Sequence, residues 1–354
     1  MTMHCSCLLV LSQMALGLTE VPSSPPSAPP PSIAYAPVLD ADGDAYAQPM
    51  IAALPLTHST EATRRALQSV TATNAFSEDG GGLRLGKVRL LKGGKLLLTN
   101  GVTTVEGSSG GGIARWATIA GRQMPGGIGL SNHATAIELP DFGWRSFGVA
   151  VGFGDRLELS YSHADFNTRD AGALLGIGQD YTFNLDTYGA KLRVAGDVVY
   201  GDPWMPQIAI GIEHKRSGDG ALVRALGAAE VNGTDYTLSA TKLLLAQSLL
   251  INGTLRYTKS NALGLLGFGS ADDGYKLQFE GTLGYQLSRR AVVGAEYRTK
   301  PDNLDLGASP AWMDIFAAYA LTDHLTVTAA YVDLGSIATF SNQRGGFLSA
   351  QVAF

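Results

Sequence analysis

The 354-residue chain contains 44 glycines, and only 16 % of its residues are charged, against about 25 % in an ordinary soluble protein. The net charge is −5, and no long lysine or arginine run occurs, which argues against nucleic-acid binding. Beyond the N-terminus the chain has no apolar run of the ~18 residues that a helical membrane span needs. The two cysteines, Cys5 and Cys7, lie close together in the first apolar stretch, which excludes a disulfide scaffold and a cysteine-based metal site.

The N-terminal region shows features of export. We expect residues 1–18 to be a signal peptide, because an apolar segment from Cys7 to Leu18 ends in small residues. No lysine or arginine precedes Arg64, so either the signal is weak or the start codon is misplaced. Residues 19–93 are rich in proline and glycine and are expected to form a mostly disordered extension.

From residue 94 onward the sequence predicts a barrel. Apolar and polar residues alternate, as in Arg156–Ser162 and Tyr275–Tyr285, so each segment presents one apolar and one polar face. We expect an all-β fold: a transmembrane antiparallel up-and-down β-barrel of about fourteen strands over residues 94–354. The alternative has twelve strands, and the segments most open to question are the first two, Lys95–Val105 and Ile113–Gly121.

Three features favour a membrane barrel over a soluble sandwich. The strand segments run about ten residues, which is the span of a tilted membrane strand, and tyrosines gather near their ends, as in interfacial girdles. Short connections alternate with long ones, which predicts periplasmic turns and extracellular loops. The last segment alternates up to Phe354, and we interpret Phe354 as a C-terminal assembly signal.

Several motifs in fixed order resemble an uncharacterised "domain of unknown function" family of Gram-negative outer-membrane proteins. The resemblance covers residues 94–354 and implies an outer-membrane β-barrel, without a known activity or known site residues. The motifs are GKLLLTNGV (94–102), LVRALGA (222–228), AQSLLINGTLR (246–256), GLLGFG (264–269), GAEYRTKPDNL (294–304) and AYVDLG (330–335).

Motifs of enzyme chemistry are weak in this sequence. Gly81–Lys87 matches the start of a phosphate-binding loop, but Val88 stands where Ser or Thr is needed. Gly107–Gly111 matches G-x-S-x-G without the required strand-to-helix turn. Asp40–Asp44 only partly matches a calcium loop, and His163 with Asp165 is a weak candidate for a catalytic pair. We therefore predict no enzyme, no cofactor and no metal site.

The polar strand faces carry charges that we expect to line the lumen, because a charge facing lipid costs ~2–4 kcal/mol at the midplane. One interpretation is a salt-bridged network that fills the barrel; the other is a water-filled pore with mixed, slightly anion-favouring walls. The predicted lumen residues are Glu158, Lys191, Arg193, Glu213, Lys215, Arg256, Lys276, Glu280, Glu296, Arg298, Lys300 and Asp314.

Three predicted extracellular loops are unexpectedly apolar: 171–177, 221–226 and 263–268. Loops in contact with water are expected to be polar, so these segments are expected to pack together or fold into the barrel mouth. They would form either a lid or an entry site for a hydrophobic solute.

These features together predict a porin-like channel or uptake pore for small solutes in the outer membrane of a Gram-negative bacterium. The alternatives are a structural barrel with a plugged lumen, a transporter of hydrophobic solutes and an outer-membrane hydrolase. The expected partners are outer-membrane lipid, the outer-membrane assembly machinery and small solutes, but no nucleic acid.

Overall fold

The computed structural model describes residues 35–39, 45–49, 83–85, 88–90, 95–99, 101–272, 274–304 and 311–354. The chain divides into two units, and Gln13–Ala75 forms the smaller one. Its described part is an antiparallel hairpin of β1 (Tyr35–Leu39) and β2 (Ala45–Pro49). The predicted signal peptide, the Asp40–Asp44 motif and most of the predicted extension lie outside the described residues.

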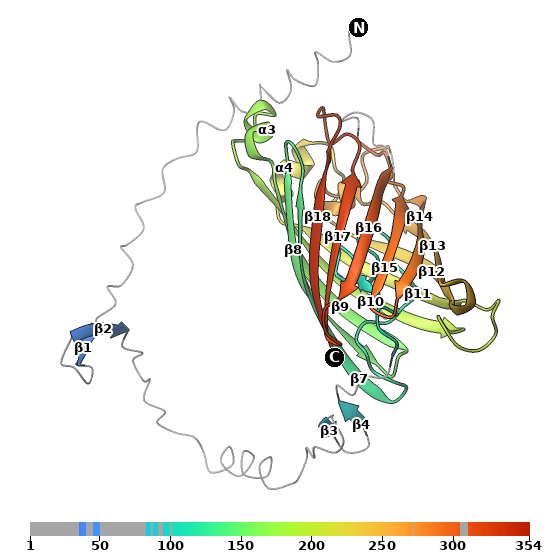
Figure 1. The fold of residues 1–354 in the computed structure, drawn as a ribbon. Helices are drawn as coiled ribbons and strands as arrows, with labels where there is room; N and C mark the ends of the chain where they lie inside the picture. The colour runs from blue at the N-terminus through green and yellow to red at the C-terminus, as the bar shows by residue number, and fades with distance from the viewer. Residues whose placement is uncertain are drawn as a thin grey trace, which may run out of the picture. The chain divides into compact units, whose positions relative to one another are not determined.

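A closed barrel of twelve antiparallel strands forms most of the larger unit (Figure 1). Each strand pairs with the next, and β18 pairs with β7 from Gly346 opposite Glu138 onward, which closes the sheet. The predicted all-β barrel is thus confirmed, with the smaller of the two strand numbers. The strands are β7 (Gly127–Glu138), β8 (Gly143–Phe153), β9 (Leu157–Asn167), β10 (Thr182–Ala195), β11 (Gln207–Ser217), β12 (Asn232–Leu244), β13 (Leu249–Thr258), β14 (Lys276–Ser288), β15 (Ala291–Arg298), β16 (Trp312–Ala320), β17 (Leu325–Asp333) and β18 (Arg344–Ala353).

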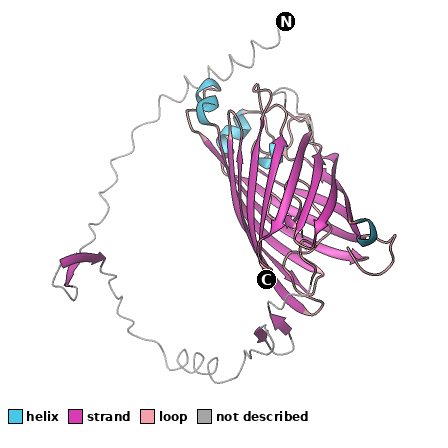
Figure 2. Ribbon diagram, viewed as in Figure 1, coloured by secondary structure: helices cyan, strands magenta, loops and turns pink. Residues whose placement is uncertain are grey.

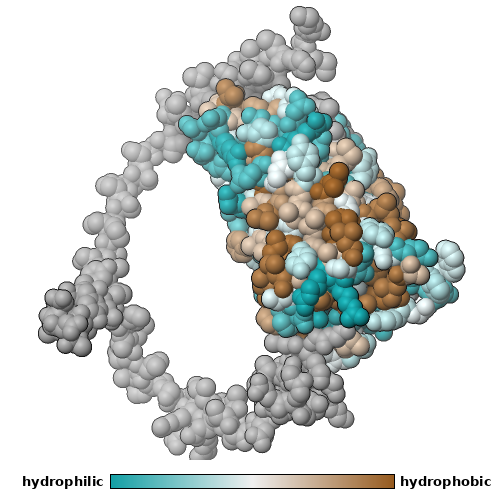
Figure 3. Space-filling view, in the orientation of Figure 1, coloured by the Kyte–Doolittle hydropathy of each residue, from teal (hydrophilic) through white to brown (hydrophobic). Residues whose placement is uncertain are grey.

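The two faces of the wall follow the alternation of the sequence. On the outside, Ile210, Leu238 and Leu255 lie next to one another across three strands, and all are exposed. On the inside, the neighbouring Ser239 and Thr254 are buried and share a hydrogen bond of 2.8 Å. In space-filling view, brown apolar residues occupy the middle of the visible wall and teal polar residues lie toward its ends (Figure 3). Such a band is what a lipid-facing barrel surface requires.

The strand connections differ between the two ends of the barrel (Figure 2). At one end, here the loop end, lie α3 (Arg169–Leu174), α4 (Gly220–Ala225) and η2 (Asn261–Gly264). At the other, the turn end, are the short connections, including one with η1 (Leu245–Gln247). The connection 196–206 is a longer exception at the turn end. None of the described helices is long and apolar enough to cross a membrane.

Residues 101–123, here called the plug, lie inside the barrel, and nearly all of them are buried. The sequence predicts the first two wall strands at Lys95–Val105 and Ile113–Gly121. This prediction is wrong, because these segments belong to the plug and to the described residues just before it. Within the plug, β5 (Val102–Thr103) and β6 (Ser109–Gly110) pair with each other, and an isolated antiparallel bridge joins Gly110 to Arg115. Two short strands, β3 (Leu83–Leu85) and β4 (Val88–Leu90), precede the plug, and β4 pairs in parallel with the beginning of β7.

The plug segments differ from wall strands because their backbone amides bond to wall side chains instead of a neighbouring strand. The amide of Ala117 donates to Thr241 Oγ1 at 2.7 Å, and that of Ala120 donates to Glu158 Oε2 at 2.7 Å. These side chains satisfy buried donors that a sheet would otherwise satisfy. Alternation alone therefore does not distinguish the plug from a thirteenth and fourteenth strand.

The filled lumen has three layers. Toward the loop end, an apolar cluster joins Val105 and Ile113 of the plug to aromatic residues of the wall and loops, such as Phe142 and Trp312. Toward the turn end, a second cluster joins Val102 and Trp116 to residues that include Leu250 and Phe316. Between the two lies a layer of buried charges.

Candidate functional site in the barrel lumen

The buried charge layer centres on Arg115 of the plug, whose side chain is almost completely inaccessible to solvent. Its Nη1 lies 2.7 Å from Glu280 Oε1, and its Nη2 lies 2.7 Å from Glu106 Oε2. Arg115 also pairs with Glu213 through both Nε and Nη2. A guanidinium offers five donors in a planar fork, so one plug residue bonds carboxylates from β11, β14 and the plug itself.

Glu106 is the second charged plug residue in this layer. It pairs with Lys215 of β11 and, at 2.5 Å, with Arg298 of β15. The wall residues are also linked to one another, since Lys215 lies 2.6 Å from Asp235 and Arg256 lies 2.9 Å from Glu280. The layer therefore contains four acids and four bases, and the plug contributes one of each. The acids are Glu106, Glu213, Asp235 and Glu280, and the bases are Arg115, Lys215, Arg256 and Arg298.

Other wall carboxylates bind the plug backbone. Glu158 accepts hydrogen bonds from the amides of Ser109 and Ala120, and it pairs with Lys191 at 3.3 Å. Glu296 accepts from the amides of Ile113 and Ala114 at 2.8 and 3.3 Å. Wall acids thus hold the plug at several points along its length.

Nine of the twelve predicted lumen residues are buried in this interior. They are Glu158, Lys191, Glu213, Lys215, Arg256, Glu280, Glu296, Arg298 and Asp314. Asp314 lies beside Glu296 in register, and its carboxylate has no hydrogen-bond partner among the described residues.

The other three predicted lumen residues lie near the ends of the barrel. Arg193 pairs with Asp155 and Asp197 toward the turn end, at 2.6 and 2.9 Å. Lys276 donates to the carbonyl of Asp302 near the loop end, at 2.6 Å. Lys300 follows β15 and lines a cavity in the mouth.

Three carboxylates, Glu106, Glu213 and Asp235, have oxygens within 4.8 Å of one another, which is a spacing that suits a metal ion. Arg115 and Lys215 already bond these carboxylates. The cationic side chains neutralise the acids, so the described groups favour an ion-pair network over a metal site at this point.

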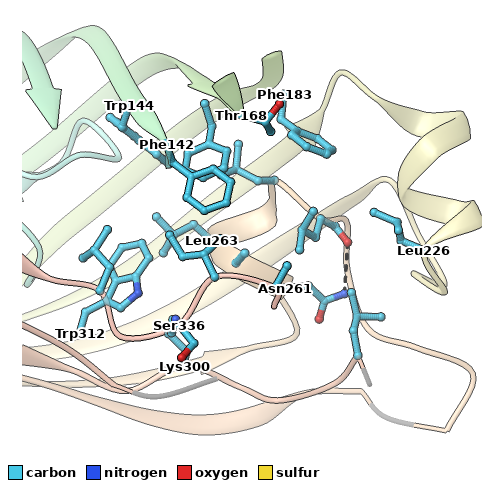
Figure 4. A pocket seen from close by; sticks show the side chains of 18 of the residues that line it. Phe142, Trp144, Thr168, Phe183, Leu226, Asn261, Leu263, Lys300, Trp312 and Ser336 are labelled. Atoms are coloured by element: carbon cyan, nitrogen blue, oxygen red, sulfur yellow. Dashed lines mark hydrogen bonds between the residues drawn. The ribbon is translucent and has the colours of Figure 1, made fainter. Parts of the chain in front are cut away.

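A cavity of about 150 Å³ lies in the barrel mouth, bounded by the loop-end connections (Figure 4). Its wall is mainly apolar: Phe142, Trp144, Phe183 and Trp312 contribute aromatic rings, and Leu263 contributes an aliphatic side chain. Residues of all three apolar loops line the cavity or pack in the surrounding cluster. The expectation that these loops pack together or fold into the mouth is confirmed.

Polar groups in the cavity wall are few. The Lys300 ammonium lies 5.0 Å from the centre of the Trp312 ring and has no hydrogen bond or ion pair to a described residue. Within the part of the chain that the structure describes, the indole nitrogens of Trp144 and Trp312 and Oδ1 of Asn303 are buried without partners. Since buried polar atoms are nearly always bonded, this is an unusual concentration of unpaired groups.

The weak enzyme motifs lie in settings unlike those that catalysis needs. In the G-x-S-x-G motif, Ser108 and Ser109 are buried in the plug and bond Glu158. His163 lies on the outer face near the loop end, with Nδ1 2.8 Å from Asp186 and Nε2 3.2 Å from Asp165. Both ring nitrogens face carboxylates, which leaves none to accept a proton from a nucleophile.

Phe354 lies at the turn end beside the start of β7. Its amide donates to the carbonyl of Leu130 at 2.8 Å, and its ring stacks on His324 with the ring centres 4.8 Å apart. Its carbonyl accepts from the amides of Arg122 and Leu130. The role of Phe354 as an assembly signal stays a prediction.

Comparison with protein families matches residues 99–351 to DUF3034, described as a protein of unknown function. The matched range includes the whole plug and the barrel wall up to the last two residues of β18. The chain belongs to this DUF3034 family. The resemblance inferred from the sequence motifs is therefore confirmed, and the family brings no activity with it. Comparison with curated proteins gives no match.

Among solved structures, the DUF3034 chain is similar to the KdgM porin, with 11 % identity and a TM-score of 0.41 over 63 % of this chain and 99 % of the other. It is also similar to outer membrane phospholipase A from Escherichia coli, with 11 % identity and a TM-score of 0.35 over 63 % of this chain and 89 % of the other. A third similar structure is that of the outer membrane protein Omp33 of Acinetobacter baumannii, with 8 % identity and a TM-score of 0.34 over 68 % of this chain and 100 % of the other.

Sequence reasoning missed the two plug charges, Glu106 and Arg115, and the wall acid Asp235. The sequence did hold an indication of the plug charges, because charged side chains predicted to lie in the lumen need partners of opposite charge there. Asp235 also fits the inward parity of Thr237 and Ser239 on β12.

Proposed function

We propose that this protein is an outer-membrane uptake channel for small solutes that the plug closes in the conformation seen here. The observation that carries the proposal is the charge layer between plug and wall. The plug contributes one acid and one base, Glu106 and Arg115, and the wall contributes three of each.

Because each set is neutral by itself, withdrawal of the plug would leave the wall charges of this layer balanced, while the wall acids Glu296 and Asp314 outside it have no basic partner among the described residues. The wall groups it uncovers, such as Thr241, Thr254 and Asn252, are polar and suited to contact with water. This arrangement favours a removable plug. A permanently sealed barrel would gain more from apolar packing, because replacing buried ion pairs by apolar residues is often neutral or stabilising.

The outer-membrane location is part of the proposal. Its support is the closed antiparallel sheet with an even number of strands, an apolar outer row such as Ile210, Leu238 and Leu255, and tyrosines such as Tyr236 and Tyr257 paired across strands. Barrels of this kind present a lipid-facing band flanked by aromatic residues.

The test is single-channel recording with a cysteine pair that locks the plug. The amide nitrogen of Ala117 lies 2.7 Å from Thr241 Oγ1, so the two residues are in direct contact, and cysteines are placed at both positions to form a disulfide. The variant Ala117→Cys/Thr241→Cys is made in a chain with Cys5→Ser and Cys7→Ser. We expect openings under reducing conditions and none after oxidation.

The matched control joins two wall strands. Thr135 Oγ1 and Ser349 Oγ lie 2.8 Å apart across the β7–β18 seam, so Thr135→Cys/Ser349→Cys staples the seam and leaves the plug free. It should conduct in both redox states. If Arg115→Met, which loosens the plug, gives no openings in a folded barrel, the non-transporting alternative is correct.

A further inference from the structure

We propose that the cavity in the barrel mouth binds a small aromatic carboxylate, with the ring among the apolar side chains and the carboxylate at Lys300. The inference rests on the proposed function, since it names the class of solute that the channel takes up. It depends on the size, lining and unpaired donors of the cavity.

The apolar lining fixes the body of the ligand. The ring centres of Phe142 and Phe166 lie 5.1 Å apart in a stacked pair, and Phe166 meets Trp144 edge-on at 6.2 Å. These three residues line the cavity together with Phe183 and Leu263, and Phe142, Trp144, Phe183 and Leu263 are labelled in Figure 4. An aromatic ring packs well against such side chains, because offset and edge-to-face ring contacts are favourable.

The volume limits the ligand to about one ring. The cavity measures about 150 Å³, and an apolar cavity of ~150 Å³ in another protein holds benzene. A long acyl chain would exceed this space. A sugar would leave hydroxyl groups unpaired against the apolar wall, which opposes its binding.

The unpaired donors specify the polar group of the ligand. Lys300 carries a positive charge without a described hydrogen bond or ion pair, and it lies over the ring of Trp312. The indole N–H of Trp312 is itself buried and has no partner among the described residues, although a buried indole usually has an acceptor. An ammonium and a neighbouring N–H donor both match a carboxylate, which only accepts hydrogen bonds when ionised.

Charged groups lie near Lys300, but no described residue forms an ion pair with it. Arg298, which precedes it at the end of β15, adds positive charge, and its guanidinium lies 6.0 Å from the Trp312 ring. Asp302 lines the same cavity and is the nearby acid. Arg298 already pairs with Glu106, so Lys300 is the cation left to meet an incoming anion.

The test is calorimetric titration of the purified full chain in detergent with two probes of nearly equal shape, benzoate and its neutral analogue benzamide. We expect benzoate to bind and benzamide to bind more weakly. Lys300→Met should lower the affinity for benzoate by about tenfold or more, since a hydrogen bond to a charged group contributes ~1.5–3 kcal/mol. The affinity for benzamide should change by no more than about twofold.

Two further variants separate the roles of the cavity. Trp312→Phe keeps a ring and removes the N–H donor, so the affinity for benzoate should fall more than the affinity for benzamide. Leu226→Trp fills part of the cavity and should abolish binding of both probes. Arg224→Met removes a positive charge from α4 outside the cavity lining and should leave both affinities unchanged; folding of each variant is checked by heat-modified mobility on a gel.

The outcomes distinguish this inference from the proposed function. If wild type binds neither probe, or binds them equally and Lys300→Met changes nothing, the carboxylate site is wrong, even where the plug-locking experiment shows a gated channel. If benzoate binds as expected but no variant conducts, the site stands and the channel proposal fails.

Discussion

Nη1 of Arg115 in the plug lies 2.7 Å from Oε1 of Glu280 on β14, although 165 positions separate the two residues in the chain. Neither side chain has appreciable contact with solvent. Removing one partner of a buried pair leaves the other charge uncompensated, at a cost of ~3–5 kcal/mol. This contact therefore links the seating of the plug to the stability of the barrel.

The first prediction concerns this contact. Arg115→Met should lower the free energy of unfolding by ~3–5 kcal/mol, because Glu106, Glu213 and Glu280 lose their shared partner. Urea unfolding in lipid vesicles measures the change. Arg145→Met is the control: its pair with Glu138 is largely exposed, so the change should stay within ~1 kcal/mol. Equal effects of the two variants would show that the buried network does not hold the plug.

A second prediction concerns the lipid-facing wall. Leu238→Arg places a charge in the exposed apolar row beside Ile210 and Leu255. The free energy of insertion into the membrane should therefore become less favourable by ~2–4 kcal/mol. The folded fraction after refolding into vesicles provides the measurement. The same substitution at Leu174, an exposed residue of α3, should have little effect. Normal insertion of Leu238→Arg would mean that this face does not meet lipid.

The orientation of the barrel gives a third prediction. With Cys5 and Cys7 replaced by serine, Leu174→Cys at the loop end should react with a membrane-impermeant thiol reagent in intact cells. Trp204→Cys, in the turn-end connection, should react only after the outer membrane is permeabilised. Both native side chains are well exposed, at 73 % and 88 %, so accessibility does not explain a difference. The opposite pattern would reverse the orientation.

A fourth prediction follows from a glycine that faces the plug. A side chain at Gly152 would collide with the carbonyl of Ala120 and the amide group of Gln123. Gly152→Ala should therefore unseat this end of the plug and raise the open fraction in single-channel recordings. Gly346→Ala in β18, where the new methyl group meets nothing within 4 Å, should behave as wild type.

The fifth prediction is the pH dependence of benzoate binding. Burial, together with the positive charge of Arg298, lowers the pKa of Lys300 to about 8, against the opposing effect of Asp302. Lys300 is protonated below that pH and loses its charge above it. Benzoate affinity should be constant between ~pH 5.5, where a carboxyl group is already ionised, and pH 7, and should fall as the pH rises above 8. Benzamide affinity should not change over this range.

Much of the barrel wall was predictable because one physical rule governs it. A strand with lipid outside and polar groups inside must alternate, and Leu277–Glu280 or Ile210–Glu213 show this directly in the sequence. The apolar loops were also informative, since a segment such as 263–268 would not leave its leucines in water. The lumen charges followed from the same parity, as the buried positions of Glu213, Glu280 and Arg298 illustrate.

The plug was not predictable from local pattern. Ile113–Gly121 has the length and hydrophobicity of a strand, but its amides bond Glu296, Thr241 and Glu158, which come from three distant strands. Such partners are visible only when the barrel has closed. The excess of glycine is evident from the sequence, but its reason requires the fold, because Gly152 and Gly129 leave room for Gln123.

The long sequence separation between the plug and its partners has a consequence for folding kinetics. Arg115 contacts residues 98 and 165 positions further along the chain, and Glu296 meets the plug across 183 positions. Contacts of this kind bring their stabilisation only after large loops have closed, which slows folding. The plug can reach its final place only when most wall strands are present, so its contacts form late in folding. Loss of the plug should therefore speed unfolding of the barrel more than it slows closure of the wall.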